Sequence, residues 1–331
     1  MAIHIRRREF IVTVASAAAA RPFAARARQT VKIAVLSGLP ENDPEGHARI
    51  KAFQEALEKL GWIDGRNVSF EVRWATPEVE TIRRLAEELA ALQPDLIVTQ
   101  NTPSTTAMLQ RTRVIPIIFV NIVDPIGSGL VANFLRPGGN VTGFVSLEST
   151  IVGKWLEWLK GIAPRVARVT VLFNPATASF AEYYLTPFKA AVRSFAVEAI
   201  AAPVRDLDAL ETTIADLGSK PNSGLIIMPD SFLITHRAVV TSLAARHRVP
   251  AVYPYRHFTE VGGLLSYGND QLDNYQRAAS YADRILKGEK PSELPVQAPV
   301  KFEMTINLNT AKMLNLEMPP DIVALADEVI E

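Results

Sequence analysis

The sequence predicts an α/β protein with two doubly wound parallel-sheet lobes joined by a multi-strand hinge. After residue 30, short apolar runs rich in β-branched residues alternate with longer amphipathic runs. This alternation indicates parallel sheets, because parallel strands need crossover helices. The alternation starts again near Val169, which indicates a second sheet. The chain has 331 residues, enough for two lobes of roughly 120–150 residues each.

The first series contains five strand-like runs separated by helical periodicity. The expected strands are residues 31–37, 68–74, 95–100, 115–122 and 141–146. Helices are expected around residues 50–60, from residue 77, from residue 104 and over residues 127–134. Gly61 ends the first helix as a C-terminal cap, and residues 137–140 form a turn.

The second series repeats this order. Its expected strands are residues 169–174, 197–204, 224–229, 249–255 and 263–268, with helices at 179–195, 207–217 and 233–246. Residues 94–98 and 223–227 resemble each other, which favours a weak internal repeat of two similar lobes. The alternative is that all α/β units look alike, and two lobes are expected in either case.

The C-terminal tail is expected to return to both lobes. A helix over residues 270–287 precedes a proline-rich extended segment and a strand at residues 302–307. We therefore expect an N-terminal lobe of residues 28–147 plus 271–295 and a C-terminal lobe of residues 148–270 plus 296–331. Several crossings between lobes form a hinge instead of a free linker.

The first 27 residues have the layout of a bacterial signal peptide. Arg6, Arg7 and Arg8 precede an apolar run over residues 11–20, and the small-x-small site Ala25-Arg26-Ala27 follows. The twin arginines resemble a Tat signal. The run is too short to span a bilayer, and the alternative is an amphipathic helix docked on a lobe. We expect cleavage near Ala27 and a periplasmic mature protein.

Composition excludes several classes of function. The chain has no cysteine, which excludes disulfides and thiolate catalysis, and its formal net charge is zero. The sequence has no stripe of basic residues of the kind that indicates a nucleic-acid-binding surface. A Gly-x-Ser-x-Gly elbow, a His-Glu-x-x-His motif and a P-loop are all absent from the sequence. We therefore expect a protein that is not an enzyme and that binds no cofactor and no metal.

Several long ungapped motifs carry a resemblance to a known family. They are DPIGSGLV at 124–131, RPGGNVTG at 136–143, GGLLSYG at 262–268, RILKGEKP at 284–291 and LPV at 294–296. The chain resembles the ABC transporter substrate-binding protein family of the tryptophan and tyrosine type. This resemblance implies a type I periplasmic-binding-protein fold.

The same resemblance implies a receptor that delivers a small solute to an ABC permease. The expected solute carries a carboxylate, as an amino acid or an aromatic acid does, and we expect a monomer. A ligand-sensing partner of a membrane receptor or kinase is the first alternative, and an exported α/β enzyme is the second. A transcription regulator of the same fold would need an N-terminal helix-turn-helix in place of the signal peptide.

The expected site lies in the cleft between the lobes, because ligands bind beyond the carboxyl ends of parallel strands. In the first lobe, the candidates that follow strands are Ser37, Gly38, Thr102, Ser104, Thr105, Asn121 and Asp124. The hydroxyls at 102–105 open a helix, and a helix N-terminus suits a carboxylate or phosphate. Alternatively, these hydroxyls only cap the N-terminus of that helix. Asp124, which precedes Pro125, alternatively forms a turn and caps the segment that follows.

In the second lobe, the candidates are Asn174, Ser179, Tyr183, Asp230, Ser231, Phe232 and Asp270. Asp230 is the candidate partner for an ammonium group, or else the N-cap of the next helix. Tyr183 and Phe232 either stack on an apolar part of the solute or pack within the lobe. Asp270 serves either the hinge or the cleft.

Overall fold

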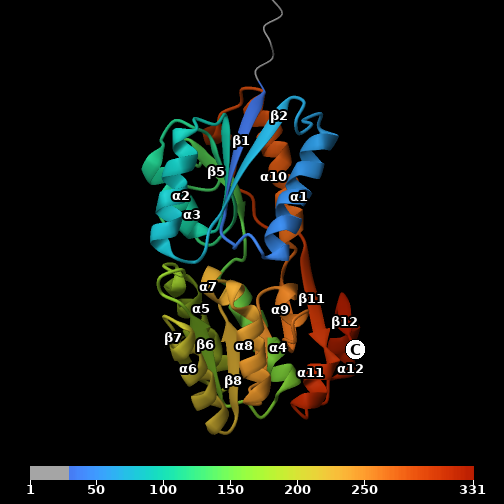
Figure 1. The fold of residues 1–331 in the computed structure, drawn as a ribbon. Coiled ribbons are helices and arrows are strands. Elements are labelled where there is room, and N and C mark those ends of the chain that lie inside the picture. The colour runs from blue at the N-terminus through green and yellow to red at the C-terminus, as the bar shows by residue number, and fades with distance from the viewer. Residues whose placement is uncertain (1–29) are drawn as a thin grey trace, which may run out of the picture.

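The computed structural model describes residues 30–331 (Figure 1), so the expected signal peptide lies outside the described residues. The N-terminal lobe contains a parallel sheet in the order β2-β1-β3-β4-β5. Its strands are β1 (Val31–Ser37), β2 (Val68–Trp74), β3 (Leu96–Gln100), β4 (Ile117–Ile122) and β5 (Val141–Val145). The strands β3, β4 and β5 are buried throughout, as expected for a sheet covered on both faces.

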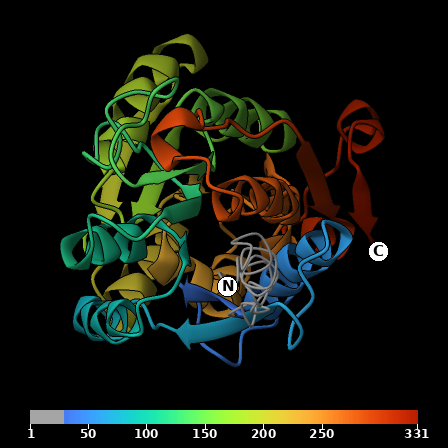
Figure 2. The same cartoon turned by 90° about the horizontal axis from the view of Figure 1, so that it is seen from above.

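Two pairs of helices cover this sheet. On one face α1 (Pro44–Lys59) packs against α10 (Gln271–Leu286), and Figure 2 shows these two helices side by side. On the other face α2 (Val79–Ala91) packs against α3 (Thr102–Arg111). Two separate apolar clusters result, one on each face of the sheet.

The C-terminal lobe contains a sheet in the order β12-β11-β10-β9-β8-β6-β7. Its strands are β6 (Arg168–Phe173), β7 (Glu198–Pro203), β8 (Ser223–Ile227), β9 (Ala251–Tyr253), β10 (Leu265–Asn269), β11 (Phe302–Asn307) and β12 (Glu328–Ile330). Strand β11 runs antiparallel to β10, whereas parallel sheets were expected. The reason is the path of the chain, because β10 leads into the N-terminal lobe and β11 returns from it.

Nine helical segments complete the C-terminal lobe and the tail. They are α4 (Ile151–Ile162), α5 (Ala181–Phe195), α6 (Leu207–Ser219), α7 (Ser231–Thr235), α8 (Arg237–Arg246), α9 (Arg256–Thr259), η1 (Pro291–Glu293), α11 (Leu308–Met313) and α12 (Pro320–Ala324) within residues 30–331. Helix α4 packs against α5, and α6 packs against α8. The fold is therefore α/β with two doubly wound lobes. Within residues 30–331, no helix combines the length and hydrophobicity needed to cross a membrane.

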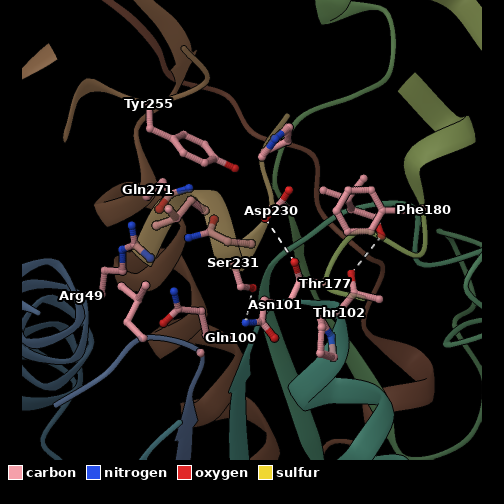
Figure 3. A pocket seen from close by; sticks show the side chains of 17 residues that line it. Arg49, Gln100, Asn101, Thr102, Thr177, Phe180, Asp230, Ser231, Tyr255 and Gln271 are labelled. Carbon is pink, nitrogen blue, oxygen red and sulfur yellow. Dashed lines mark hydrogen bonds between the residues drawn. The ribbon is translucent and has the colours of Figure 1, made fainter. Parts of the chain in front are cut away.

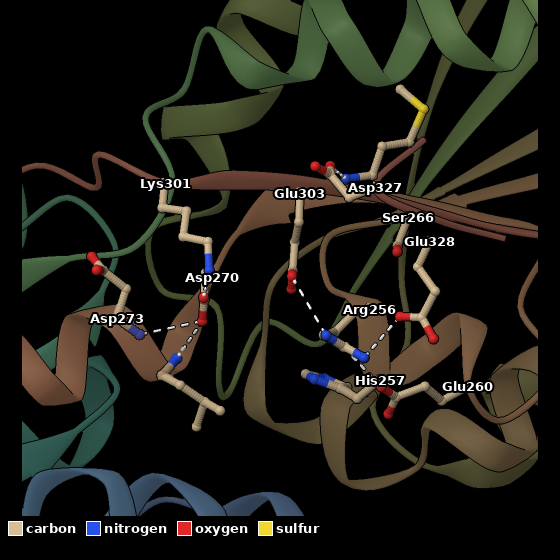
Figure 4. Close-up of polar contacts among 12 residues, drawn as sticks. Arg256, His257, Glu260, Ser266, Asp270, Asp273, Lys301, Glu303, Asp327 and Glu328 are labelled. Atoms are coloured by element: carbon tan, nitrogen blue, oxygen red, sulfur yellow. Dashed lines mark hydrogen bonds and ion pairs between the residues drawn. The ribbon is translucent and has the colours of Figure 1, made fainter. Parts of the chain in front are cut away.

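Three segments cross between the lobes, at the ends of β5 and β10 and before β11. They are held together by hydrogen bonds: Ser146 Oγ donates to Asn269 Oδ1 at 3.3 Å, and the amide of Asp270 donates to the Lys301 carbonyl at 3.0 Å. The Lys301 ammonium also lies 2.7 Å from the Asp270 carboxylate (Figure 4). Crossings tied to one another in this way form a hinge.

The last crossing lies further along the chain than the expected boundary at 295. Val296 donates its amide to the Phe134 carbonyl at 2.7 Å and Gln297 to the Gly143 carbonyl at 2.9 Å. Both residues therefore belong to the N-terminal lobe, because their hydrogen-bond partners lie there.

Two helix predictions were wrong. Residues 127–134 form turns and bends, because Asp124 (φ 45°) and Gly129 (φ 68°) adopt left-handed backbone conformations that interrupt a right-handed helix. The expected helix at 233–246 is divided into α7 and α8 at His236, whose φ and ψ of −98° and 22° are not helical.

Candidate functional site

A cavity lined by residues of both lobes lies between them (Figure 3). The N-terminal lobe and α10 contribute Gly38, Leu39, Arg49, Gln100, Asn101, Thr102, Pro103, Asn121, Val123 and Gln271. The C-terminal lobe contributes Thr177, Phe180, Pro229, Asp230, Ser231, Ile234 and Tyr255. Most of these residues follow the carboxyl ends of β1, β3, β4, β6 and β8, where a doubly wound sheet binds its ligand.

Arg49 is a buried cation without a good partner. Its side chain is 1% exposed, and its Nε and Nη2 have no hydrogen-bond partner among the described residues. The carboxylate of Glu45, one turn earlier on α1, lies 3.8 Å from Nη2, beyond hydrogen-bond distance. An uncompensated buried charge costs several kcal/mol, so this guanidinium has unused capacity for an anion inside the cavity.

Asp230 is a buried anion on the opposite lobe (Figure 3). It caps α7 by accepting the Leu233 amide at 2.9 Å, and it also accepts the Asn174 amide at 2.9 Å and the Thr177 hydroxyl at 3.1 Å. Burial raises the pKa of Asp230 to about 6 despite these hydrogen bonds. The Phe232 amide is a fourth hydrogen-bond donor to this carboxylate. Asp230 therefore places a well-bonded negative charge at the cavity wall.

Two asparagines at strand ends line the cavity in uncommon backbone conformations. Asn101 follows β3 with φ 68° and ψ 164°, and Asn121 lies in β4 with φ 58°. Asn101 Nδ2 donates across the lobes to Ser231 Oγ at 2.8 Å. Strained residues of this kind cost about 1–3 kcal/mol each and cluster at ligand sites.

Unpartnered polar atoms converge on the same cavity. Asn121 Oδ1 accepts from Asn274 Nδ2 at 2.7 Å, while Asn121 Nδ2 has no partner within residues 30–331. Gln271 Oε1 is also buried without a partner in that part of the chain. The cavity thus presents unused donors from Arg49 and Asn121 and an unused acceptor from Gln271, which matches a ligand with an anionic end and a donor group.

Five of the residues expected from the sequence line this cavity: Gly38, Thr102, Asn121, Asp230 and Ser231. Asp230 is also the N-cap of α7, so both roles considered for it are compatible.

The other expected site residues lie outside this cavity. Five of them form hydrogen bonds within their own lobe: Ser37 with Leu39, Ser104 and Thr105 with the β3–α3 turn, Asp124 with the Gly127 amide, and Asn174 with Arg205 and Ala176. Three line neighbouring pockets, namely Ser179, Tyr183 and Phe232, and Asp270 is the N-cap of α10. Asp270 therefore lies in the hinge.

Arg49, Gln271 and Tyr255 were missed by the sequence analysis. One signal for Arg49 was present, since it stands four residues before the buried Phe53 and so shares the apolar face of α1. Gln271 and Tyr255 belong to hinge-proximal segments whose position depends on the arrangement of both lobes. Burial raises the pKa of Tyr255 to about 12, so its hydroxyl stays neutral at the cavity wall.

Among residues 30–331, no group of three or more histidine, aspartate or glutamate side chains is arranged to hold a metal ion.

Known proteins resemble this chain over most of its length. The family model of the ABC transporter substrate binding protein matches residues 32–330. A tyrosine-binding protein of Clostridioides difficile is 26% identical over 267 residues, covering 81% of this chain and 76% of that protein. A conserved domain protein of Vibrio cholerae superposes with a TM-score of 0.84 at 25% identity, covering 91% of this chain and 99% of that chain.

Two further structures differ in their bound state. An ABC domain of Streptococcus pneumonia in complex with L-Trp gives a TM-score of 0.83 at 25% identity, covering 91% of this chain and 100% of that one. A ligand-free, open substrate binding protein of Clostridium difficile gives only 0.68 at 26% identity, covering 91% of this chain and 99% of that one. Identity and coverage are nearly equal for these two structures, and this chain superposes better on the L-Trp complex than on the open structure. In this chain side chains of the two lobes meet directly, as Asn101 does with Ser231. The chain belongs to the family of ABC transporter substrate-binding proteins and is a solute-binding protein, not an enzyme.

Proposed function

We propose that the protein captures a small carboxylate-bearing solute, an amino acid or an aromatic acid, in the interlobe cavity and delivers it to an ABC importer. The observation that carries this proposal is the Arg49 guanidinium, buried in the cavity with two nitrogen atoms unpartnered among the described residues. A guanidinium binds a carboxylate through two parallel hydrogen bonds. Such charge-assisted, bidentate pairs are among the strongest hydrogen-bonded contacts in proteins.

The opposite charges of the cavity favour an amino acid within this class. The carboxylate would accept from Arg49 and Asn121, and the ammonium would donate to Gln271 and lie beside the negative charge of Asp230. The L-Trp complex and the tyrosine-binding relative support the same class.

Capture would proceed by hinge closure. Arg49 belongs to the N-terminal lobe and Asp230 to the C-terminal lobe, so one zwitterion bridges both lobes. A ligand that contacts both lobes binds the closed state more tightly and shifts the equilibrium towards it. The three crossings at the hinge would restrict this motion to opening and closing.

Export, the permease partner and the monomeric state are further parts of the proposal. The twin-arginine segment at the N-terminus and the family of the chain support a periplasmic location. Replacing Arg7 and Arg8, the pair before Glu9 and Phe10, by lysine would keep the charge and remove a Tat signal, so cell fractionation tests the export route. A sensor for a membrane receptor or kinase would use the same cavity, and uptake of labelled solute by cells lacking the gene distinguishes import from sensing.

The binding test uses the protein from residue 28 onward and three probes. L-tryptophan carries both charges, tryptamine lacks the carboxylate, and indole propionate lacks the amine. In calorimetry we expect L-tryptophan to bind more tightly than indole propionate and tryptamine not to bind. At 100 times its dissociation constant, a ligand stabilises the folded state by about 2.7 kcal/mol, which thermal unfolding detects. Equal binding of tryptamine and L-tryptophan would contradict the carboxylate assignment.

A further inference from the structure

An ion pair joins the two lobes outside the cavity. Arg237, the first residue of α8, donates through Nη1 and Nη2 to both carboxylate oxygens of Asp43, at 2.6 and 3.0 Å. Asp43 is the N-cap of α1 and belongs to the N-terminal lobe. The two side chains are only 12% and 5% exposed. This bidentate geometry, largely shielded from water, is the strongest form of the Arg–carboxylate pair.

The environment of this pair differs from that of the other polar contacts across the cleft. Asn101 and Ser231 form a neutral hydrogen bond, and His257 lies 3.7 Å from Glu45, too far for a hydrogen bond. Burial and three nearby arginines lower the pKa of His257 well below its usual value, so this histidine is neutral and contributes no ion pair. Within the described residues, Asp43–Arg237 is therefore the strong ion pair between the lobes outside the hinge, where Lys301 pairs with Asp270.

We propose that the Asp43–Arg237 ion pair is a latch that holds the lobes closed and slows release of the bound solute. Neither residue lines the cavity, so the latch acts on the closed state and not on the solute itself. When the lobes separate, both side chains become solvated and their attraction is lost. The latch therefore acts on the rate of opening, and affinity differences of this kind appear mainly in the dissociation rate.

The test uses the protein from residue 28 onward with Arg237→Met, Asp43→Asn and the double variant. Asparagine is as good an N-cap as aspartate, so Asp43→Asn keeps the start of α1 intact. Arg246→Met is the matched control, because Arg246 lies on the same helix α8 and its partner Glu211, at 3.7 Å, belongs to the same lobe. Far-UV circular dichroism and the melting temperature check that each variant is folded.

Two readouts are measured. Small-angle scattering of the ligand-free variants gives the radius of gyration, which we expect to rise in both single variants and to stay unchanged in the control. Stopped-flow fluorescence gives the release rate of L-tryptophan, which we expect to rise about tenfold in each single variant and no further in the double variant.

The scattering readout does not depend on the proposed solute, whereas the release readout rests on the proposed function. If no amino acid binds but the single variants expand, the latch stands and the solute assignment fails. An unchanged radius of gyration in both Arg237→Met and Asp43→Asn would overturn the latch. Independent, additive effects of the two substitutions on release would also overturn it, because members of one pair have to be coupled.

Discussion

Replacing Arg49 by methionine has opposite consequences for binding and for stability. Methionine keeps a long flexible side chain on the buried face of α1 but removes the charge and all its donors. The ligand-free protein keeps the guanidinium buried with Nε and Nη2 unpartnered among the described residues. We therefore expect Arg49→Met to abolish tight binding while making the ligand-free protein more stable.

The size of both effects follows from the burial of this group. Truncating one partner of a buried, hydrogen-bonded charge pair costs about 2–5 kcal/mol of affinity, which is roughly 30-fold to several thousand-fold in the dissociation constant. Replacing a buried ion pair by apolar groups stabilises a protein by up to about 4 kcal/mol. Arg49→Met should gain part of this stabilisation, because the remaining Glu45 is 26% exposed and stays solvated. Each kcal/mol corresponds to a rise of about 2–4 °C in melting temperature for a unit of 150–250 residues.

Calorimetry with L-tryptophan and thermal unfolding without it measure the two effects in the same preparation. Arg49→Lys is the control, because lysine keeps the charge but loses the planar fork. We expect this control to bind weakly and to gain no stability. Wild-type affinity in Arg49→Met, or a lower melting temperature in its ligand-free form, would refute the reasoning.

Three further predictions concern the cavity and the hinge. A Cβ added at Gly38 would lie 1.9 Å from Asn101 Nδ2, so Gly38→Ala should displace Asn101 from Ser231 and weaken L-tryptophan binding in calorimetry by about tenfold without unfolding the protein. Burial raises the pKa of Asp230 from 3.8 to about 6; the folded state therefore binds this proton more tightly than the unfolded chain, and ligand-free stability in urea should fall as the pH rises through this window, a fall that Asp230→Asn removes. Burial raises the pKa of Glu303 from 4.5 to about 7 despite Arg256 nearby (Figure 4). The free energy of unfolding of the wild type should therefore fall as the pH rises from 4.5 to about 7, whereas that of Glu303→Gln should not. Urea titrations at both pH values measure this difference.

Much of the fold could be predicted because local signals and tertiary structure agree. The β-branched runs became buried strands, and residues such as Asp206 and Asp270 cap the helices that follow them. The turn region after Asp124 could not be predicted from periodicity, because left-handed backbone conformations at Asp124 and Gly129 decide its path. The antiparallel strand β11 likewise depends on the path of the chain between lobes, which no local pattern encodes.

The rule that ligands lie at strand ends located only part of the cavity. It identified Gly38, Asn121 and Asp230 because each follows or ends a strand. It could not identify Arg49, because this residue reaches the cavity from a helix. Side chains from two lobes meet there only after both have folded and closed, so the unused donors and acceptors appear only in the three-dimensional structure.

The most direct test of the account is a crystal structure of the protein from residue 28 onward, grown with L-tryptophan. The account predicts closed lobes and a ligand carboxylate within hydrogen-bond distance of Arg49 Nε and Nη2. It also predicts the ammonium group beside Asp230. A ligand bound elsewhere, or a carboxylate held by other groups while Arg49 faces Glu45, would contradict it.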